Sequence, residues 1–194
     1  MYKMMKLVDT VRIPPTLLGE EVEPTVKNAL REKLEGQVDK KLGCLVAIHK
    51  IVEIGEGHIL VGDGAVYYDV TFEAIMFVPE LQEIIEGEVV EAVSFGVFVG
   101  IGPMDGLLHV SQITDDFISY DAKNARLVTR NGNKSIAEGD HVRARIVAVS
   151  INEREPNESK IGLTMRQTAL GKLQWLEEAR KRKQPSEAAP EGTA

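Results

Sequence analysis

Two phenylalanines, a histidine and a lysine in this sequence are residue types that together bind single-stranded nucleic acid. Phe95 and Phe98 lie in the run SFGVFVG, His109 lies in GLLHVS, and Lys160 opens the run KIGLTM. Aromatic rings stack on bases and cationic groups meet phosphates, so such side chains gathered on one face would hold a flexible strand. This chemistry requires that the surrounding elements bring all four side chains to the same surface.

The alternation of residues around Phe98 predicts a strand with two different faces. The expected core face is apolar and consists of Val97, Val99 and Ile101. Phe98 and Gly100 then point the other way, because side chains alternate along a strand. Phe95 has the wrong parity, but the turn Ser94-Phe95-Gly96 can supply a bulge that re-aims it. Two interpretations stay open: the rings are an exposed stacking platform, or other parts of the chain cover them.

Short strands in the second half of the chain indicate a small barrel. They are expected at 87–101, 106–110, 141–151 and 160–165, separated by Gly, Asp or polar turns. Residues 112–140 are expected to form a long insertion with one hairpin at Asn131-Gly132. A helix over 169–183 should follow, and the last residues, rich in Pro, Ala and Glu, are expected to be disordered.

The first half reads as an α+β sheet with a helix on one face. Strands are expected at 3–13, 44–54, 57–61 and 65–79, and an amphipathic helix at 24–42 with Gly36 as its weak point. Gly62-Asp63-Gly64 forms a tight turn between two of these strands. The predicted domains are therefore residues 1–80, residues 81–171 with the insertion 112–140, and a C-terminal segment over 172–194.

Composition limits the classes of function. The 194 residues carry a formal net charge of −7, which is unlike a dedicated duplex-DNA binder with its basic face. One cysteine and four scattered histidines give no zinc-ligand spacing, so neither a metal nor another cofactor is expected. The lone cysteine is typical of a reducing cytoplasm. No apolar run reaches 18 residues and the N-terminus lacks the apolar centre of a signal peptide, so no membrane association is expected.

The remaining polar residues and glycine-rich turns admit simpler interpretations. Arg143 and Arg145 alternate on one strand face and suit either surface ion pairs or phosphate contacts. The Gly-Asp-Gly turn is not followed by the Lys-Ser/Thr of a phosphate loop. Asp115-Asp116 suits a solvated loop or helix cap better than a metal site. Ser111, close to His109, lacks the context of a catalytic nucleophile, and no set of residues forms a catalytic constellation.

Most of residues 82–166 resemble the S-one RNA-binding domain, a variety of OB-fold. The resemblance rests on GEVVEAVSFGVFVGIGPMDGLLHVSQI, GDHVRARIVAVS and KIGLTM. It implies that Phe95, Phe98 and His109 belong to the RNA patch, with Lys160 at the family's arginine position. Ser150 stands where that family has an aspartate.

Nearly the whole chain resembles the larger of the two stalk subunits of archaeal RNA polymerase, called E or E prime, counterpart of the seventh subunit of eukaryotic polymerase II. This resemblance rests on MYKMMKLVDTVRIPPTLLGE, the GDG turn, VYYDVTFEAIMFVP and YDAKNARL. It implies an N-terminal ribonucleoprotein-like domain that docks on core polymerase, and an OB barrel near the RNA exit path. It also implies a heterodimer with the smaller stalk subunit, called F.

The resulting expectation is a non-catalytic polymerase subunit that binds nascent single-stranded RNA. Its docking contact is expected at Gly62, Asp63 and Gly64, because glycines let two backbones approach closely. The apolar run Ile75–Val78 is expected to be surface left for the partner. The alternative is a free-standing RNA-binding factor of the exosome or the translation machinery that bears the same barrel.

Overall fold

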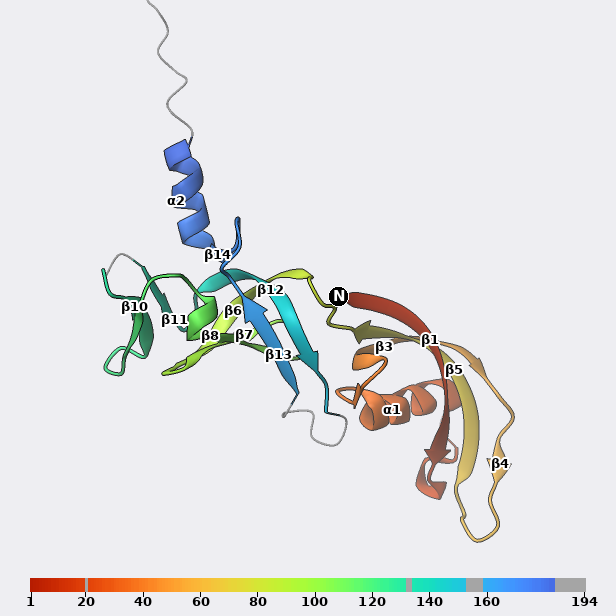
Figure 1. The fold of residues 1–194 in the computed structure, drawn as a ribbon. Coiled ribbons are helices and arrows are strands. Elements are labelled where there is room, and N and C mark those ends of the chain that lie inside the picture. Colours follow the sequence, from red (N-terminus) through yellow and green to blue (C-terminus); the bar gives the residue numbers. More distant parts are fainter. Residues whose placement is uncertain (20, 132–133, 153–158, 184–194) are drawn as a thin grey trace, which may run out of the picture. The chain divides into compact units, whose positions relative to one another are not determined.

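The chain forms two compact units. A computed structural model describes residues 1–19, 21–131, 134–152 and 159–183 (Figure 1). One unit contains residues 1–80 and the short segment 150–159, and the other contains residues 81–149 and the chain from 160 onward. The expected disordered tail, from residue 184, lies outside the described residues.

The first unit is an antiparallel sheet with one helix. Its strands follow the order β1 (Tyr2–Ile13), β5 (Val66–Phe77), β3 (Gly43–Ile54) and β2 (Val38–Asp39), and β4 (His58–Ile59) also pairs with β5. The helix α1 (Val22–Leu34) follows β1 after a short 3-10 turn, η1 (Pro15–Leu17). The predicted strand, helix and three further strands (β1, α1, β3, β4 and β5) occur in that order, and the short β2 is an additional strand.

The core of the first unit lies between α1 and one face of the sheet. Val26 and Leu30 of α1 are fully buried, and Val11, Ile48 and Phe72 belong to the same cluster. Apolar positions four residues apart on the helix face the sheet, and the sheet presents alternate residues to them. Burial of this helix face against the sheet holds the unit together.

The helix is shorter than the sequence predicts. It ends at Leu34 rather than at residue 42, and Val38 pairs with Cys44 in β2. Gly36 has φ +83, a conformation that favours glycine, and its N–H donates to the carbonyl of Leu45 at 2.9 Å. The apolar spacing that suggested a longer helix therefore continues into a strand because Gly36 turns the chain back onto β3.

The second unit is a closed five-stranded barrel. Around it run β13 (Lys160–Thr164), β8 (Asp105–His109), β7 (Gly96–Gly100), β6 (Ile84–Val93) and β12 (His141–Ser150), and β12 pairs with β13 to close it. β13 lies parallel to β8, whereas β6, β7 and β8 form an antiparallel meander. The predicted single strand over 87–101 is two strands, because the chain turns at Ser94-Phe95.

Alternate residues of the barrel strands fill its interior as expected. The buried side chains are Val97, Val99, Ile101, Leu108, Ile161, Leu163 and Met165. Val110, expected on the same face, is only half-buried because the strand has already ended and η2 (Val110–Gln112) begins there.

The insertion forms its own three-stranded sheet. β9 (Ile118–Asp121), β10 (Arg126–Thr129) and β11 (Ser135–Ala137) are antiparallel neighbours with β10 in the middle. The predicted hairpin corresponds to β10–β11, although Gly132 of its turn lies outside the described residues, and β9 is an additional strand that the sequence does not predict. Leu127 and Ile136 are buried, and contacts of β10 and β11 with β6 join this sheet to the barrel.

A buried ion pair attaches the C-terminal segment to the insertion. Lys172 of β14 (Gly171–Lys172) places Nζ 2.7 Å from Oδ2 of Asp140, and both side chains are largely buried. The helix α2 (Leu173–Lys183) follows, four residues later than predicted, and Lys134 lies 5.2 Å from the ring centroid of its Trp175. The charged pair and the cation–π contact fix the start of α2.

Candidate nucleic-acid interface and docking turn

The two phenylalanines form an aromatic pair at one end of the barrel. Their ring centroids are 6.3 Å apart and the rings are nearly perpendicular, at 88°. Phe95 is 47% exposed and Phe98 is half-buried, so the insertion leaves the pair accessible. The edge-to-face contact orients each ring and leaves much of the Phe95 ring exposed to solvent. Within its own unit the pair is accessible, and its role as a stacking platform stays a prediction.

A tight turn, and not a bulge, places Phe95 beside Phe98. Gly96 directly follows the turn between β6 and β7, and a Cβ built there would lie 2.4 Å from the carbonyl oxygen of Leu108. Only glycine therefore permits this approach of β7 to β8. The N–H of Val110 donates to the carbonyl of Phe95 at 2.9 Å, which fixes the turn against the end of β8. The bulge of this hairpin lies elsewhere, between Val89 and Glu91.

His109 lies next to this turn with a defined ring orientation. It pairs with Gly96 across β7 and β8, and its side chain is exposed. Nδ1 accepts the N–H of Ser111 at 3.2 Å and lies 2.8 Å from its hydroxyl. A neutral ring that accepts at Nδ1 carries its hydrogen on Nε2, so it offers a donor at that atom. Ser111, which the sequence does not mark as functional, is the residue that orients this ring.

Lys160 lies at the other end of the same face. β13 pairs with β8 so that Ile161 is opposite Gly106, which places Lys160 beside Asp105. Asp105 and His109 are four residues apart on β8, a distance of about 13 Å along the strand. The structure thus brings Phe95, Phe98 and His109 together and separates Lys160 from them by the length of β8.

The arginines of β12 are on a different part of the barrel. β12 is separated from β7 by β6 in one direction and by β13 and β8 in the other. Nε of Arg143 donates to Oε1 of Glu86 at 2.8 Å, and the Arg145 Nε is buried without a hydrogen-bond partner among the described residues. Arg143 has the surface ion pair of the simpler interpretation. Neither arginine shares a surface with the aromatic pair.

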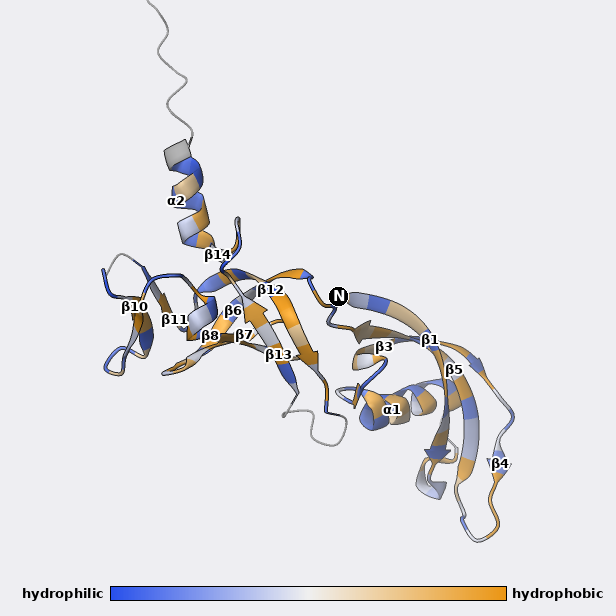
Figure 2. Ribbon diagram, in the orientation of Figure 1, coloured by the Kyte–Doolittle hydropathy of each residue, from blue (hydrophilic) through white to orange (hydrophobic). Residues whose placement is uncertain are grey.

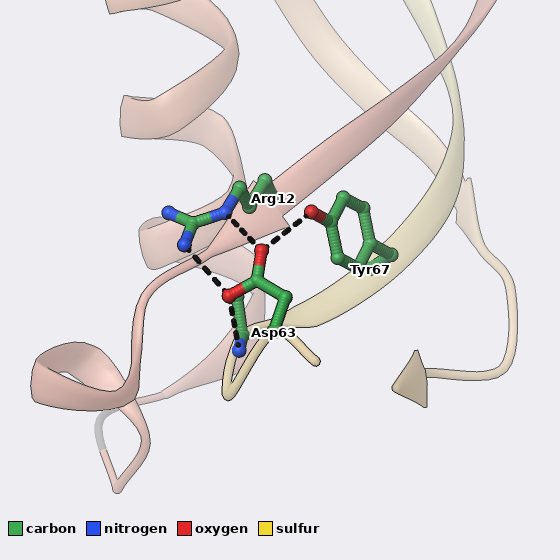
Figure 3. Close-up of polar contacts among 4 residues, drawn as sticks. Arg12, Asp63 and Tyr67 are labelled. Carbon is green, nitrogen blue, oxygen red and sulfur yellow. Dashed lines mark hydrogen bonds and ion pairs between the residues drawn. The ribbon is translucent and has the colours of Figure 1, made fainter. Parts of the chain in front are cut away.

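The turn at residues 62–64 is held by the carboxylate of its own aspartate (Figure 3). Arg12 donates two hydrogen bonds to Asp63, from Nε at 2.8 Å and from Nη2 at 2.9 Å. The hydroxyl of Tyr67 donates to the same carboxylate at 2.7 Å, and the N–H of Ala65 at 3.1 Å. These contacts tie the turn to β1 and β5.

The same contacts shift the pKa values of both Asp63 and Arg12. The hydrogen bonds to Asp63 hold its pKa well below the ordinary value of an aspartate. The largest effect comes from Arg12, followed by Tyr67 and the Ala65 amide. The Asp63 carboxylate in turn raises the pKa of Arg12. Asp63 therefore stays ionised as an internal anchor of the turn.

The surface of this turn is apolar. Ile59, Leu60 and Val61 directly precede it and are 68%, 49% and 108% exposed, and Figure 2 shows the stretch after β4 in the colours of apolar residues. Gly62 has φ +95, and a Cβ on Gly64 would make an ordinary contact with Pro15 at 3.5 Å. The sequence-based choice of Gly62, Asp63 and Gly64 thus located the turn but missed Arg12, Tyr67 and the exposed apolar residues. Their roles depend on strand register, which the sequence does not display.

The described residues contain neither a metal cluster nor a membrane-crossing helix. Among them, no three His, Cys, Asp or Glu side chains gather as a metal site would require. Asp115, one candidate, forms an ion pair with Arg166. No helix in the described part of the chain is long and apolar enough to cross a membrane.

Comparison with known proteins identifies both halves. Residues 8–64 match the SHS2 domain found in the N terminus of Rpb7p/Rpc25p/MJ0397, and residues 78–160 match the S1 RNA binding domain. These matches agree with the predicted α+β domain followed by an OB-fold barrel.

Relatives that align over most of the chain are subunits of RNA polymerases. The chain is 43% identical over 183 residues to DNA-directed RNA polymerase subunit Rpo7 of Saccharolobus shibatae, which covers 93% of this chain and 100% of that protein. It is 39% identical over 177 residues to Rpo7 of Sulfolobus acidocaldarius, covering 91% of this chain and 95% of that protein. DNA-directed RNA polymerase III subunit RPC8 of Bos taurus is 27% identical over 162 residues, with 80% and 79% covered. The chain therefore belongs to the Rpo7 family of DNA-directed RNA polymerase subunits, and it is a polymerase subunit rather than an enzyme on its own.

Proposed function

We propose that this subunit binds nascent single-stranded RNA on the barrel face that carries Phe95, Phe98 and His109. The observation that carries the proposal is the perpendicular pair of accessible rings beside an oriented histidine. Rings accept a base of any sequence on their π-face, so recognition is largely sequence-tolerant. Lys160, at the far end of the face, meets the phosphate backbone of the same strand rather than the stacked bases.

The charge of the chain indicates modest affinity. With a net charge of −7 and few cations on the aromatic face, phosphate contacts are few and the salt dependence of binding is shallow. Weak binding suffices where RNA is already present at high local concentration, as it is beside a transcribing polymerase. Arg143 and Arg145 are left out of this interface because they lie on β12, away from β7.

In the polymerase, the chain docks on the core enzyme through the turn Gly62-Asp63-Gly64 and pairs with the smaller stalk subunit, called F. The exposed apolar residues 59–61 support the first contact, and the exposed side chains of Tyr2, Met4 and Val8 on β1 support the second. The stalk so formed supports transcription initiation and works in the cytoplasm. A free-standing exosome or translation factor is the less supported alternative, because the Rpo7 relatives align over 95–100% of their own length.

Replacing Phe98 tests the RNA proposal. Phe98→Ala is expected to weaken binding of a single-stranded oligouridylate by about 1–3 kcal/mol, the contribution of one stacked base. The measurement is fluorescence anisotropy on the full-length chain co-expressed with the smaller stalk subunit, with a thermal melt of each variant.

The control is Leu108→Ala, which removes a fully buried side chain from the same barrel. It should cost about 2–5 kcal/mol of stability, more than Phe98→Ala, whose ring is partly exposed. A folded Phe95/Phe98 double alanine variant that binds RNA as well as the wild type would refute the proposal.

A further inference from the structure

The insertion sheet carries an exposed aromatic ring and a cation that the barrel face does not use. Phe117, directly before β9, is 72% exposed. Arg130, directly after β10, is also exposed, and its N–H donates to the carbonyl of Phe117 at 2.9 Å. Most of the hydrophobic surface of the Phe117 ring is therefore not covered by any described part of the chain.

Strand register places both side chains on one face of the insertion sheet. β9 and β10 pair so that Asp121 is opposite Arg126, and the same register places Phe117 opposite Arg130. The ion pair between Arg126 and Asp121, at 3.2 Å, shows that such opposite residues reach each other here. Leu127, of the other parity, is buried on the opposite face of the sheet. The ring and the guanidinium are therefore neighbours on the solvent face.

The insertion is attached to the barrel at the end that carries the aromatic pair. The N–H of Met165, just beyond β13, donates to the carbonyl of Gln112 at 2.8 Å, and the Thr164 hydroxyl donates to the Gln112 side chain at 2.8 Å. The N–H of Val110, on the same η2 turn, holds the carbonyl of Phe95. η2 thus links the end of β8 to Phe95 on one side and to the insertion on the other.

The distance between the two aromatic positions suits one bound strand. Phe117 is seven positions after Val110, which limits the span between them to about 25 Å even for an extended chain. An OB-fold accommodates about 4–16 nucleotides of single strand. A strand that lies on Phe98 and Phe95 can therefore continue to Phe117 without a second molecule of RNA.

Arg130 differs from the nearby arginines in having no carboxylate partner among the described residues. Arg126 is paired with Asp121, and Arg166 with Asp115. A guanidinium beside an exposed ring is suited to a phosphate whose base stacks on that ring. This charge favours a nucleic acid over an apolar protein surface as the ligand.

We propose that Phe117 and Arg130 form a second contact for single-stranded RNA, in which a base stacks on Phe117 and the adjoining phosphate pairs with Arg130. This inference rests on the proposed RNA binding by the barrel face, which it extends along the same strand. It gives the insertion a role in lengthening the binding site.

The test compares a short and a long probe. Labelled oligouridylates of 4 and 16 nucleotides are titrated by anisotropy against the full-length chain co-expressed with the smaller stalk subunit. Phe117→Ala should weaken binding of the 16-mer by about fivefold or more and leave the 4-mer unchanged, whereas Phe98→Ala should weaken both. Arg130→Gln should reduce the salt slope of 16-mer binding by about 0.7. Leu81→Ala, another exposed apolar position in this unit, is the control and should change neither probe.

The outcomes separate this inference from the function on which it rests. If Phe98→Ala weakens both probes and Phe117→Ala weakens neither, the second contact is refuted and the barrel face stands. If Phe98→Ala weakens neither probe, the RNA face itself is refuted, and the extension with it. If Phe117→Ala leaves RNA binding intact but reduces co-purification with polymerase, Phe117 is a protein contact and the inference is wrong.

Discussion

At the scale of single residues, Asp63 is a residue that the sequence suggested as a partner contact but that forms its hydrogen bonds within its own chain. Its carboxylate accepts hydrogen bonds from Arg12, Tyr67 and Ala65. These contacts leave it little capacity to bind a partner directly. Asp63 therefore shapes the turn, and the exposed residues before it are the surface that we propose contacts the core enzyme.

Stability should depend on pH through Asp63. The folded pKa of Asp63 lies below its ordinary value of 3.8, so its stabilisation is fully present above the unfolded pKa and is lost as the pH falls below about 4. Asp63→Asn removes this contribution at every pH. The difference in unfolding free energy between wild type and variant should stay constant near neutral pH and shrink below about pH 4, as measured by urea unfolding.

The comparison needs a carboxylate from outside this cluster. Asp116→Asn, an exposed position of the other unit, serves as the control for the loss of one negative charge. A gap between wild type and Asp63→Asn that persists unchanged to about pH 2 would show that ionisation of Asp63 does not contribute to the stability of the fold.

At the scale of elements, two connecting segments are held in place by ion pairs. They are the turn after β4 and the segment between β11 and α2. Both are fixed by side chains from distant parts of the chain. Arg12 of β1 holds the first, and Lys172 holds the second through Asp140.

Removing one side of the buried pair should be costly. Lys172→Met leaves the Asp140 carboxylate buried without its cation, which typically costs about 3–5 kcal/mol. The double variant Lys172→Met/Asp140→Asn should recover most of this loss, because the amide oxygen still accepts from the Ala137 N–H. Chemical denaturation measures the stability, and hydrogen exchange in α2 reports its release. Equal stabilities of the single and double variants would contradict this account.

A substitution in the exposed apolar residues 59–61 should affect docking without affecting the stability of the fold. Val61→Asp places a charge on a fully exposed side chain and should reduce co-purification with core polymerase at unchanged thermal stability. The control is Val52→Asp, an exposed position of β3 in the same unit. Gly64 is a cleaner second probe than Gly62, because Gly62 has φ +95 and a larger residue there strains the backbone. Undiminished recruitment of Val61→Asp would exclude this turn as the docking contact.

At the scale of the whole molecule, the apolar run that the sequence suggested as partner surface is largely buried within the chain. Met76 and Phe77 are buried within the chain, and Ile75 and Val78 are partly buried. Another group of exposed apolar side chains lies at the start of the chain: Met1, and Tyr2, Met4 and Val8 of β1. Alternation puts Met4 and Val8 on the sheet face that does not contact α1.

This surface predicts dependence on a partner. The chain alone should be poorly soluble and should form a stable one-to-one heterodimer with the smaller stalk subunit, because an exposed apolar patch marks an interaction site. Met4→Lys together with Val8→Lys should raise the solubility of the isolated chain and weaken the heterodimer, as followed by light scattering and gel filtration. A monodisperse wild-type chain that gains no thermal stability from its smaller partner would contradict the prediction.

The sequence determined the features that depend on neighbours along the chain. Alternation identified the core face of β7, and glycine placed the turns at Gly62 and Gly96. The residue pattern around Phe95, Phe98 and His109 is sufficient to identify the barrel family. These inferences held because side-chain period and backbone freedom are local properties.

Which residues share a surface depends on how the strands pair in three dimensions. Parallel pairing of β13 with β8 moved Lys160 to the far end of the face, and closure of the barrel put Arg143 on another side of it. The pairing of β1 with β5 brought Arg12 opposite Tyr67 and within reach of Asp63. Strand order and register arise from contacts between residues far apart in the sequence, so no local pattern of residues records them.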